Sequence, residues 1–198
     1  MSEIVFDRTC ELVAAQLAPY TQARTESPQS KMQPAVICGL YAPHEDPSQE
    51  KIALVCSWGA LTHETFDIAL RPPQATIHPN ETIEDAFTRK IVGELELSAA
   101  ALRRVYGLRT EEPPIIGGVA KHNTLKAFGI LCGVVTTTPK LTAPDDKLLY
   151  AGWKTFAEAE AAFDTQAATP HLEQRAERHF EVLDHIQHLA QQLRSREQ

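Results

Sequence analysis

Two charged residues four positions apart, Lys90 and Glu94, are the clearest candidates for chemistry in this chain of 198 residues. Apolar residues recur at three- and four-residue steps from Ile83, which predicts an amphipathic helix over residues 82–95. Positions 90, 93 and 94 share one face of such a helix. A Lys–Glu pair at this spacing stabilises a helix by only about 0.3–0.5 kcal/mol. Lys90 could instead bind an anionic ligand directly.

Histidine is the other residue type that favours acid–base chemistry here. His78 lies in the loop before the predicted helix, where an imidazole can act as general acid or base near neutral pH without a metal. The alternative is a solvent-exposed loop histidine. Glu94 leaves a similar choice between a metal ligand or catalytic acid and a surface carboxylate paired with Lys90. His122 precedes the strongest predicted strand and could line the same cleft.

Residues 75–97, ATIHPNETIEDAFTRKIVGELEL, resemble the box of the Nudix hydrolase family. That motif reads Gly, five residues, Glu, seven residues, then Arg-Glu-apolar-any-Glu-Glu-any-Gly-apolar. The frame fits without a gap. The matching positions are Glu81, Arg89, Ile91, Glu94 and Leu97. The positions that differ are Ala75, Lys90, Gly93 and Glu96.

The resemblance implies a pyrophosphatase that uses Mg²⁺ or Mn²⁺ held by helix carboxylates. Mg²⁺ requires oxygen ligands in near-octahedral geometry, and in hydrolysis it activates water and polarises phosphoryl oxygens. The three family positions are Lys90, Gly93 and Glu94 in this sequence, so one carboxylate of three remains. Glu94 is therefore the one candidate metal ligand, and we expect weak metal-dependent activity at best. Gly93 lies inside the predicted helix, where glycine costs roughly 1 kcal/mol relative to alanine. A residue that destabilises its own helix is typical of altered function.

The resemblance also bears on Glu81 and Arg89. It implies that they brace the loop against the helix, and together with His122 they are the candidates for substrate contact. Glu81, Arg89 and His122 would then surround a small-molecule cleft between the helix and the loops at residues 60–80 and 113–124.

Three interpretations of function remain open. The first is a Nudix hydrolase-like protein that acts on or binds a small, anionic or diphosphate-containing metabolite. The second is a metal-independent enzyme on the same scaffold, such as an isomerase, cyclase or hydrolase, which uses His78, Glu94 or Lys90. The third is a non-catalytic ligand-binding or protein-interaction module, which the apolar terminal helices suggest.

The strands and helices that must position these residues predict an α/β (α+β) fold, and the resemblance implies a Nudix-like α/β/α sandwich with a mixed sheet and extra terminal helices. We expect three segments: 1–33 as a helix and linker, 34–165 as the Nudix-like domain, and 166–198 as an amphipathic helix packed on that domain or in a dimer. The expected strands are 34–42, 51–58, 65–70, 125–137 and 148–153. The expected helices are 3–18, 82–95, 98–104, 156–163 and 170–195.

Composition limits the classes of partner and the cellular compartment that we expect. The net charge of −7 argues against nucleic acid, which is bound mainly by clustered Lys and Arg, and the sequence has no run of eighteen apolar residues that would indicate a membrane span. The four cysteines are typical of buried free thiols, and the N-terminus favours a helix over a signal peptide, so we expect a cytoplasmic protein. We expect the histidines of the last helix to be surface residues: His171, His179, His185 and His188.

Overall fold

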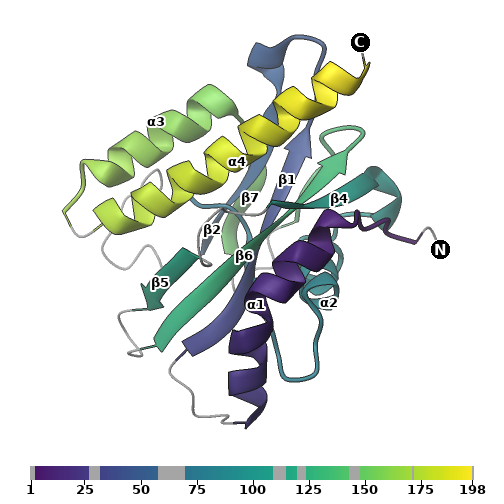
Figure 1. The fold of residues 1–198 in the computed structure, drawn as a ribbon. Coiled ribbons are helices and arrows are strands. Elements are labelled where there is room, and N and C mark those ends of the chain that lie inside the picture. The colour runs from purple at the N-terminus through teal and green to yellow at the C-terminus, as the bar shows by residue number, and fades with distance from the viewer. Residues whose placement is uncertain are drawn as a thin grey trace.

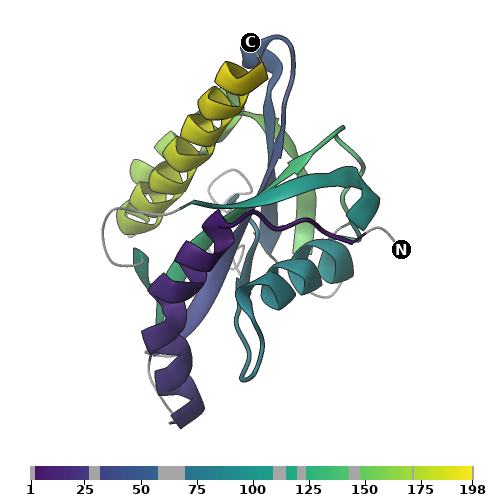
Figure 2. The same ribbon diagram turned by 45° about the vertical axis from the view of Figure 1, so that its right-hand side comes forward.

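A computed structural model describes residues 3–26, 32–57, 70–108, 115–119, 124–142, 148–170 and 172–197. Its helices are α1 (Thr9–Glu26), α2 (Ile83–Thr88), α3 (Phe156–Ala167) and α4 (Glu173–Glu197). Its strands are β1 (Met32–Ala42), β2 (Lys51–Ser57), β3 (Gln74–Thr76), β4 (Leu102–Leu108), β5 (Ile115–Val119), β6 (Thr124–Val135) and β7 (Leu148–Thr155). One mixed sheet lies between α1 and α2 on one face and α3 and α4 on the other (Figures 1 and 2). The predicted α/β/α sandwich is confirmed.

The sheet is organised around β1 and β6. The strand order is β4-β6-β1-β2-β7, with β3 also paired to β1 and β5 to β6. β1 and β6 run parallel, whereas β1 and β2 form an antiparallel hairpin, with Tyr41 opposite Ile52. The strand predicted at 125–137 is therefore central, and it brings the two halves of the chain together.

The sheet alternates its buried side chains between two cores, as period-two strands should. Val36 and Leu40 face the core under α1 and α2, while Ile37 and Tyr41 face the core under α3 and α4. All four cysteines are free and buried, as expected. None of the helices in the described residues is long and apolar enough to cross a membrane.

Both terminal helices are packed on the sheet. At the start of α1, a Cβ added to Gly107 of β4 would collide with the Thr9 backbone, so glycine permits this close approach. At the end of α4, Arg194 forms an ion pair with the buried Glu50, which also accepts a hydrogen bond from Tyr41 Oη at 2.6 Å. α4 therefore packs on the same sheet as the rest of the chain, while the division into three segments and a homodimer stay predictions.

The predictions of helices at 3–18 and 98–104 were partly wrong. The first helix begins at Thr9 rather than residue 3, because Asp7 caps it through the Thr9 amide while Phe6 forms a bridge to Val105 of β4. It then continues through Pro19 into the predicted linker. Residues 98–104 do not form a helix, since a 3₁₀ turn at Ala99–Ala101 leads directly into β4. The strand expected at 65–70 lies almost wholly outside the described residues.

The histidines of α4 differ from one another. His185 is half-buried and His188 is exposed, but His179 is buried, so its assignment to the surface was wrong. Its Nδ1 lies 2.9 Å from Gln166 Oε1 of α3, and its ring packs 5.1 Å from the ring of Phe163. His171 lies outside the described residues.

Candidate functional site

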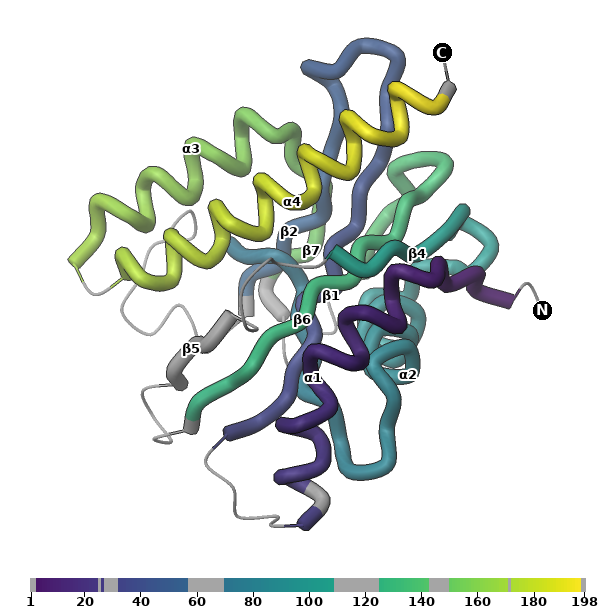
Figure 3. Tube along the Cα trace, in the orientation of Figure 1, coloured from purple at the N-terminus to yellow at the C-terminus, as the bar shows by residue number. Residues whose placement is uncertain are grey.

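The helix of the box segment begins with a capping box at Thr82. Thr82 Oγ1 accepts a hydrogen bond from the Asp85 amide, and the Asp85 carboxylate accepts one from the Thr82 amide. The predicted apolar stripe is buried and packs against the sheet: Ile83, Ala86, Phe87, Ile91 and Leu95. The chain then continues into β4 (Figure 3).

Glu81 and Arg89 brace the loop against this helix. Arg89 Nε donates to Glu81 Oε1 at 2.7 Å, and Arg89 Nη2 donates to Glu81 Oε2 at 3.0 Å and to the Thr76 carbonyl at 2.9 Å. The hydrogen bonds from Arg89 and the His78 amide lower the pKa of Glu81 although partial burial opposes them. The architectural role is therefore supported, and substrate contact by either residue stays a prediction.

Lys90 and Glu94 form the predicted ion pair, with Nζ 2.7 Å from Oε2. Arg89 Nη1 also lies 3.3 Å from Glu94 Oε1, so both oxygens of this carboxylate face cations. The Lys90 side chain is only 9% exposed and that of Glu94 25% exposed, so the pair is less hydrated than a surface pair. Glu81, Arg89, Lys90 and Glu94 together form what we call the box network, which holds two positive and two negative charges.

The end of the box helix departs from the regular α-helix that was predicted. Arg89–Glu94 form a π-helical turn, in which the Leu95 amide donates to the Lys90 carbonyl. Gly93 is exposed there, and a Cβ at this position would meet no atom within 4 Å. Glu96, where the family motif has glycine, adopts a left-handed backbone with φ of 53°. That conformation suits glycine far better than other residues.

The side chains of the box network do not fit a divalent cation of the family type. Mg²⁺ needs several hard oxygen ligands, but the only box carboxylate near Lys90 already holds two cationic side chains. Nowhere in the described part of the chain do three His, Cys, Asp or Glu side chains gather in a way that could hold a metal ion. No metal-dependent step is therefore assigned to Glu94.

Of the two candidate histidines, the structure describes His78 but not His122. His78 lies beside the box network, since its amide donates to Glu81 Oε2 at 2.7 Å and its Nδ1 lies 3.9 Å from the same oxygen. Its side chain is 59% exposed, which fits the alternative of a loop histidine, and its catalytic role stays a prediction. His122 lies outside the described residues, as do most of the loops expected to bound the cleft.

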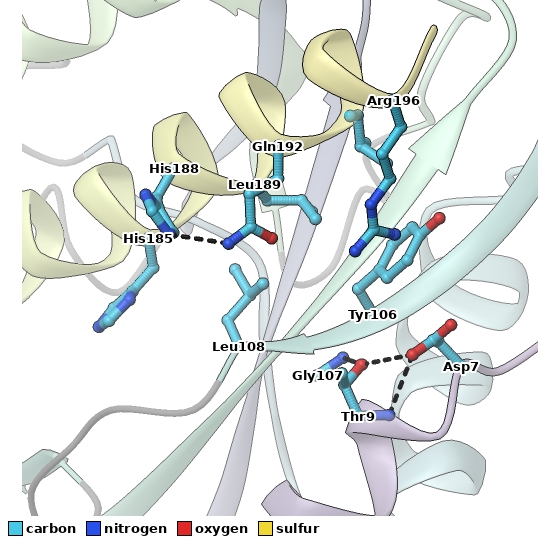
Figure 4. A pocket seen from close by; sticks show the side chains of 11 residues that line it. Asp7, Thr9, Tyr106, Gly107, Leu108, His185, His188, Leu189, Gln192 and Arg196 are labelled. Carbon is cyan, nitrogen blue, oxygen red and sulfur yellow. Dashed lines mark hydrogen bonds between the residues drawn. The ribbon is translucent and has the colours of Figure 1, made fainter.

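A pocket of about 290 Å³ lies away from the box, between α4, β4 and the start of α1. Figure 4 shows His185, His188 and Arg196 projecting from α4 across from Tyr106 of β4. No predicted site residue lines it. Sequence reasoning missed it because its walls come from segments nearly 190 positions apart, which only the sheet edge brings together.

The sequence analysis did not identify the cationic residues Lys126 and Arg178 as candidate functional residues. Lys126 of β6 donates from Nζ to Thr76 Oγ1 at 2.8 Å, and Thr76 is the residue whose carbonyl receives Arg89 of the box. A lysine inside an otherwise apolar strand was the available signal in the sequence.

Comparison with known proteins shows that this chain is similar in fold to solved structures. No family model matches the chain, and no curated protein matches it in sequence. Among solved structures, the NUDIX domain of Shewanella oneidensis NrtR complexed with ADP ribose is similar at a TM-score of 0.55 and 12% identity, covering 86% of this chain and 96% of that one. A C. elegans Ap4A hydrolase binary complex is similar at a TM-score of 0.51 and 12% identity, covering 75% and 95%. The fold of this chain is the Nudix fold that its box segment predicted.

Proposed function

We propose that this chain binds a small, anionic, nucleotide-derived metabolite on a Nudix scaffold, without the metal-dependent pyrophosphatase chemistry of the family. The observation that carries the proposal is the box network, in which Glu94 is held by Lys90 at 2.7 Å and by Arg89 at 3.3 Å. The ADP ribose bound by the NrtR domain supports the ligand class.

The energetics of the box network also support binding without a metal. A divalent cation at Glu94 would have to displace Lys90, whose ammonium would then remain nearly buried and unpaired. Breaking a buried pair by removing one partner costs about 3–5 kcal/mol, and the partial exposure of Glu94 reduces that figure here. Lys90 thus replaces the metal's charge with a fixed one, and Gly93 leaves the space of a lost carboxylate open.

A titration of ADP-ribose into the full chain tests the proposal. We expect calorimetry to show the same affinity in EDTA as with Mg²⁺, and chromatography to show no cleavage of the diphosphate. Metal-dependent turnover that disappears in Glu94→Gln would refute the proposal, because Glu94 would then act as a metal ligand.

A pair of matched double variants tests the metal argument itself. Lys90→Glu with Gly93→Glu restores three carboxylates to the face, whereas Lys90→Gln with Gly93→Gln has the same shape without charge. We expect Mg²⁺ to raise the melting temperature of the first variant but not that of the second or of the natural chain. A natural chain that Mg²⁺ stabilises as strongly as the first variant would contradict the reasoning.

A metal-independent acid–base enzyme is the second candidate, and the position of His78 favours it. Its imidazole is 59% exposed and lies 3.9 Å from Glu81, so it is accessible to a ligand and close to a carboxylate. Consumption of a ligand in EDTA that is lost in His78→Gln but kept in His44→Gln, an exposed histidine elsewhere, would select this candidate over a binding protein.

A further inference from the structure

Cationic side chains gather on the sheet face that α3 and α4 cover, near the start of β6. Lys126 belongs to β6 and Arg178 to α4, and the charge of Arg71 lowers the pKa of both Lys126 and the buried His179. The chain as a whole carries a net charge of −7, so its composition does not explain this concentration of positive charge. These groups lie outside the box network.

The geometry of Lys126 places its ammonium over the centre of the sheet. Phe128, two residues further on, pairs with Ala35 of β1, and Ala35 pairs with Thr76 of β3 on its other side. Because β1 lies between β6 and β3, the Lys126 side chain must span β1 to reach Thr76 Oγ1 at 2.8 Å. Its ammonium has three donors, and this bond uses one of them.

Arg178 enters the same layer from α4. Its Cζ lies 5.1 Å from the centroid of the Phe128 ring, a cation–π contact. Since Lys126 and Phe128 are two residues apart on β6, their side chains share a face of the sheet, and the charge of Arg178 reaches the Lys126 ammonium and lowers its pKa. Stacking on a ring leaves the edge of a guanidinium available to donate hydrogen bonds.

The electrostatics show that these cations repel one another. Burial lowers the pKa of Lys126, and the charges of Arg71, Arg24 and Arg178 lower it further. Burial likewise lowers the pKa of Arg178, and so does Arg175. Among the described residues, no carboxylate offsets this repulsion at Lys126 or Arg178. A bound anion would remove the repulsion, and it would bind more tightly for that reason.

We propose that Lys126, Arg178 and the Thr76 hydroxyl form a phosphate-binding site between β6 and α4. An ammonium, a planar guanidinium fork and a hydroxyl are the groups that bind phosphoryl oxygens with charge-assisted hydrogen bonds. The site concerns the phosphate group, whichever molecule carries it, so it stands independently of the proposed function. If both are correct, this site receives the phosphates of the metabolite.

Inorganic pyrophosphate titrated into the full chain in EDTA tests the site. We expect Lys126→Met and Arg178→Met each to weaken binding by about tenfold or more, because each loses a charge-assisted contact. Arg104→Met is the matched control, since Arg104 is exposed on β4 and contacts Asp7. The variants should melt cooperatively without ligand, and Arg178→Met should melt no lower than the natural chain, because repulsion falls and the methionine still covers Phe128.

The outcomes separate this inference from the proposed function. Pyrophosphate that fails to bind, or that binds the two variants as tightly as the control, overturns the site. Pyrophosphate binding that depends on both residues while ADP-ribose does not bind keeps the site and refutes the proposed function. ADP-ribose affinity that falls in parallel with pyrophosphate affinity places both ligands on the same residues.

Discussion

His179 should make the stability of this protein depend on pH in a way that one substitution removes. The imidazole is buried between α3 and α4. Gln166 donates from Nε2 to the Leu70 carbonyl, so its Oε1 accepts from His179 Nδ1. Burial lowers the pKa of His179 well below 6.5, and the charges of three nearby arginines lower it further.

The sign and size of the effect follow from proton linkage. Below pH 6.5 the unfolded chain takes up a proton on this histidine that the folded chain excludes. The free energy of unfolding is therefore fully retained above that pH and falls as the pH falls. Each pH unit between 6.5 and the lowered pKa of His179 costs about 1.4 kcal/mol, because one proton is excluded over that interval.

Urea denaturation at a series of pH values measures this loss as a shift of the midpoint at constant slope. His179→Gln keeps a donor toward Gln166 and cannot titrate, so its stability should fall less over the same range by that amount. His188→Gln, an exposed position on the same helix, is the control and should behave like the natural chain. Equal pH slopes for the natural chain and His179→Gln would refute the reasoning.

Four further substitutions test the backbone and charges around the box and the α1 contact. Glu96→Gly should raise the free energy of unfolding by about 1 kcal/mol in chemical denaturation, since it relieves a left-handed backbone; a loss of stability would contradict this. Gly93→Ala should raise it by about 0.5–1 kcal/mol, because the new methyl group meets only open space, and an unchanged denaturation midpoint would count against it. Gly107→Ala should lower the melting temperature, with a cost of about 1–3 kcal/mol, because its Cβ would collide with the Thr9 backbone; an unchanged melting temperature would show that α1 shifts freely. Glu81→Gln should destabilise the protein near neutral pH, and the difference from the natural chain should shrink as the pH falls through the lowered pKa of Glu81, which an acid titration of both proteins measures.

The sequence was enough to predict the frame of the box and the layers around it. Capping at Thr82 depends on residues three positions apart, and the buried stripe depends on local spacing, so both could be read without a structure. The π-helical turn could not, because its apolar period resembles that of an α-helix. Its end is fixed by contacts from elsewhere, such as the hydrogen bond from the Thr142 amide to the Leu95 carbonyl.

Burial of His179 was predictable in principle. Ala176, His179, Leu183 and Ile186 follow one another at steps of three, four and three, which is the spacing of a buried stripe. Histidine as a residue type favours the surface, but at this position the spacing of the stripe decides its burial. The role of Lys126 was not predictable, since it depends on β1 lying between β6 and β3.

The last turn of α4 is anchored to the β1–β2 hairpin by an ion pair. Helix ends ordinarily fray, yet Arg194 holds the carboxylate of Glu50, which is only 2% exposed on the opposite hairpin. Amide protons near Arg194 should therefore exchange with deuterium almost as slowly as those in the middle of the helix. A protease that removes the final turn would leave Glu50 without its cation, so the integrity of the hairpin depends on the last few residues of α4.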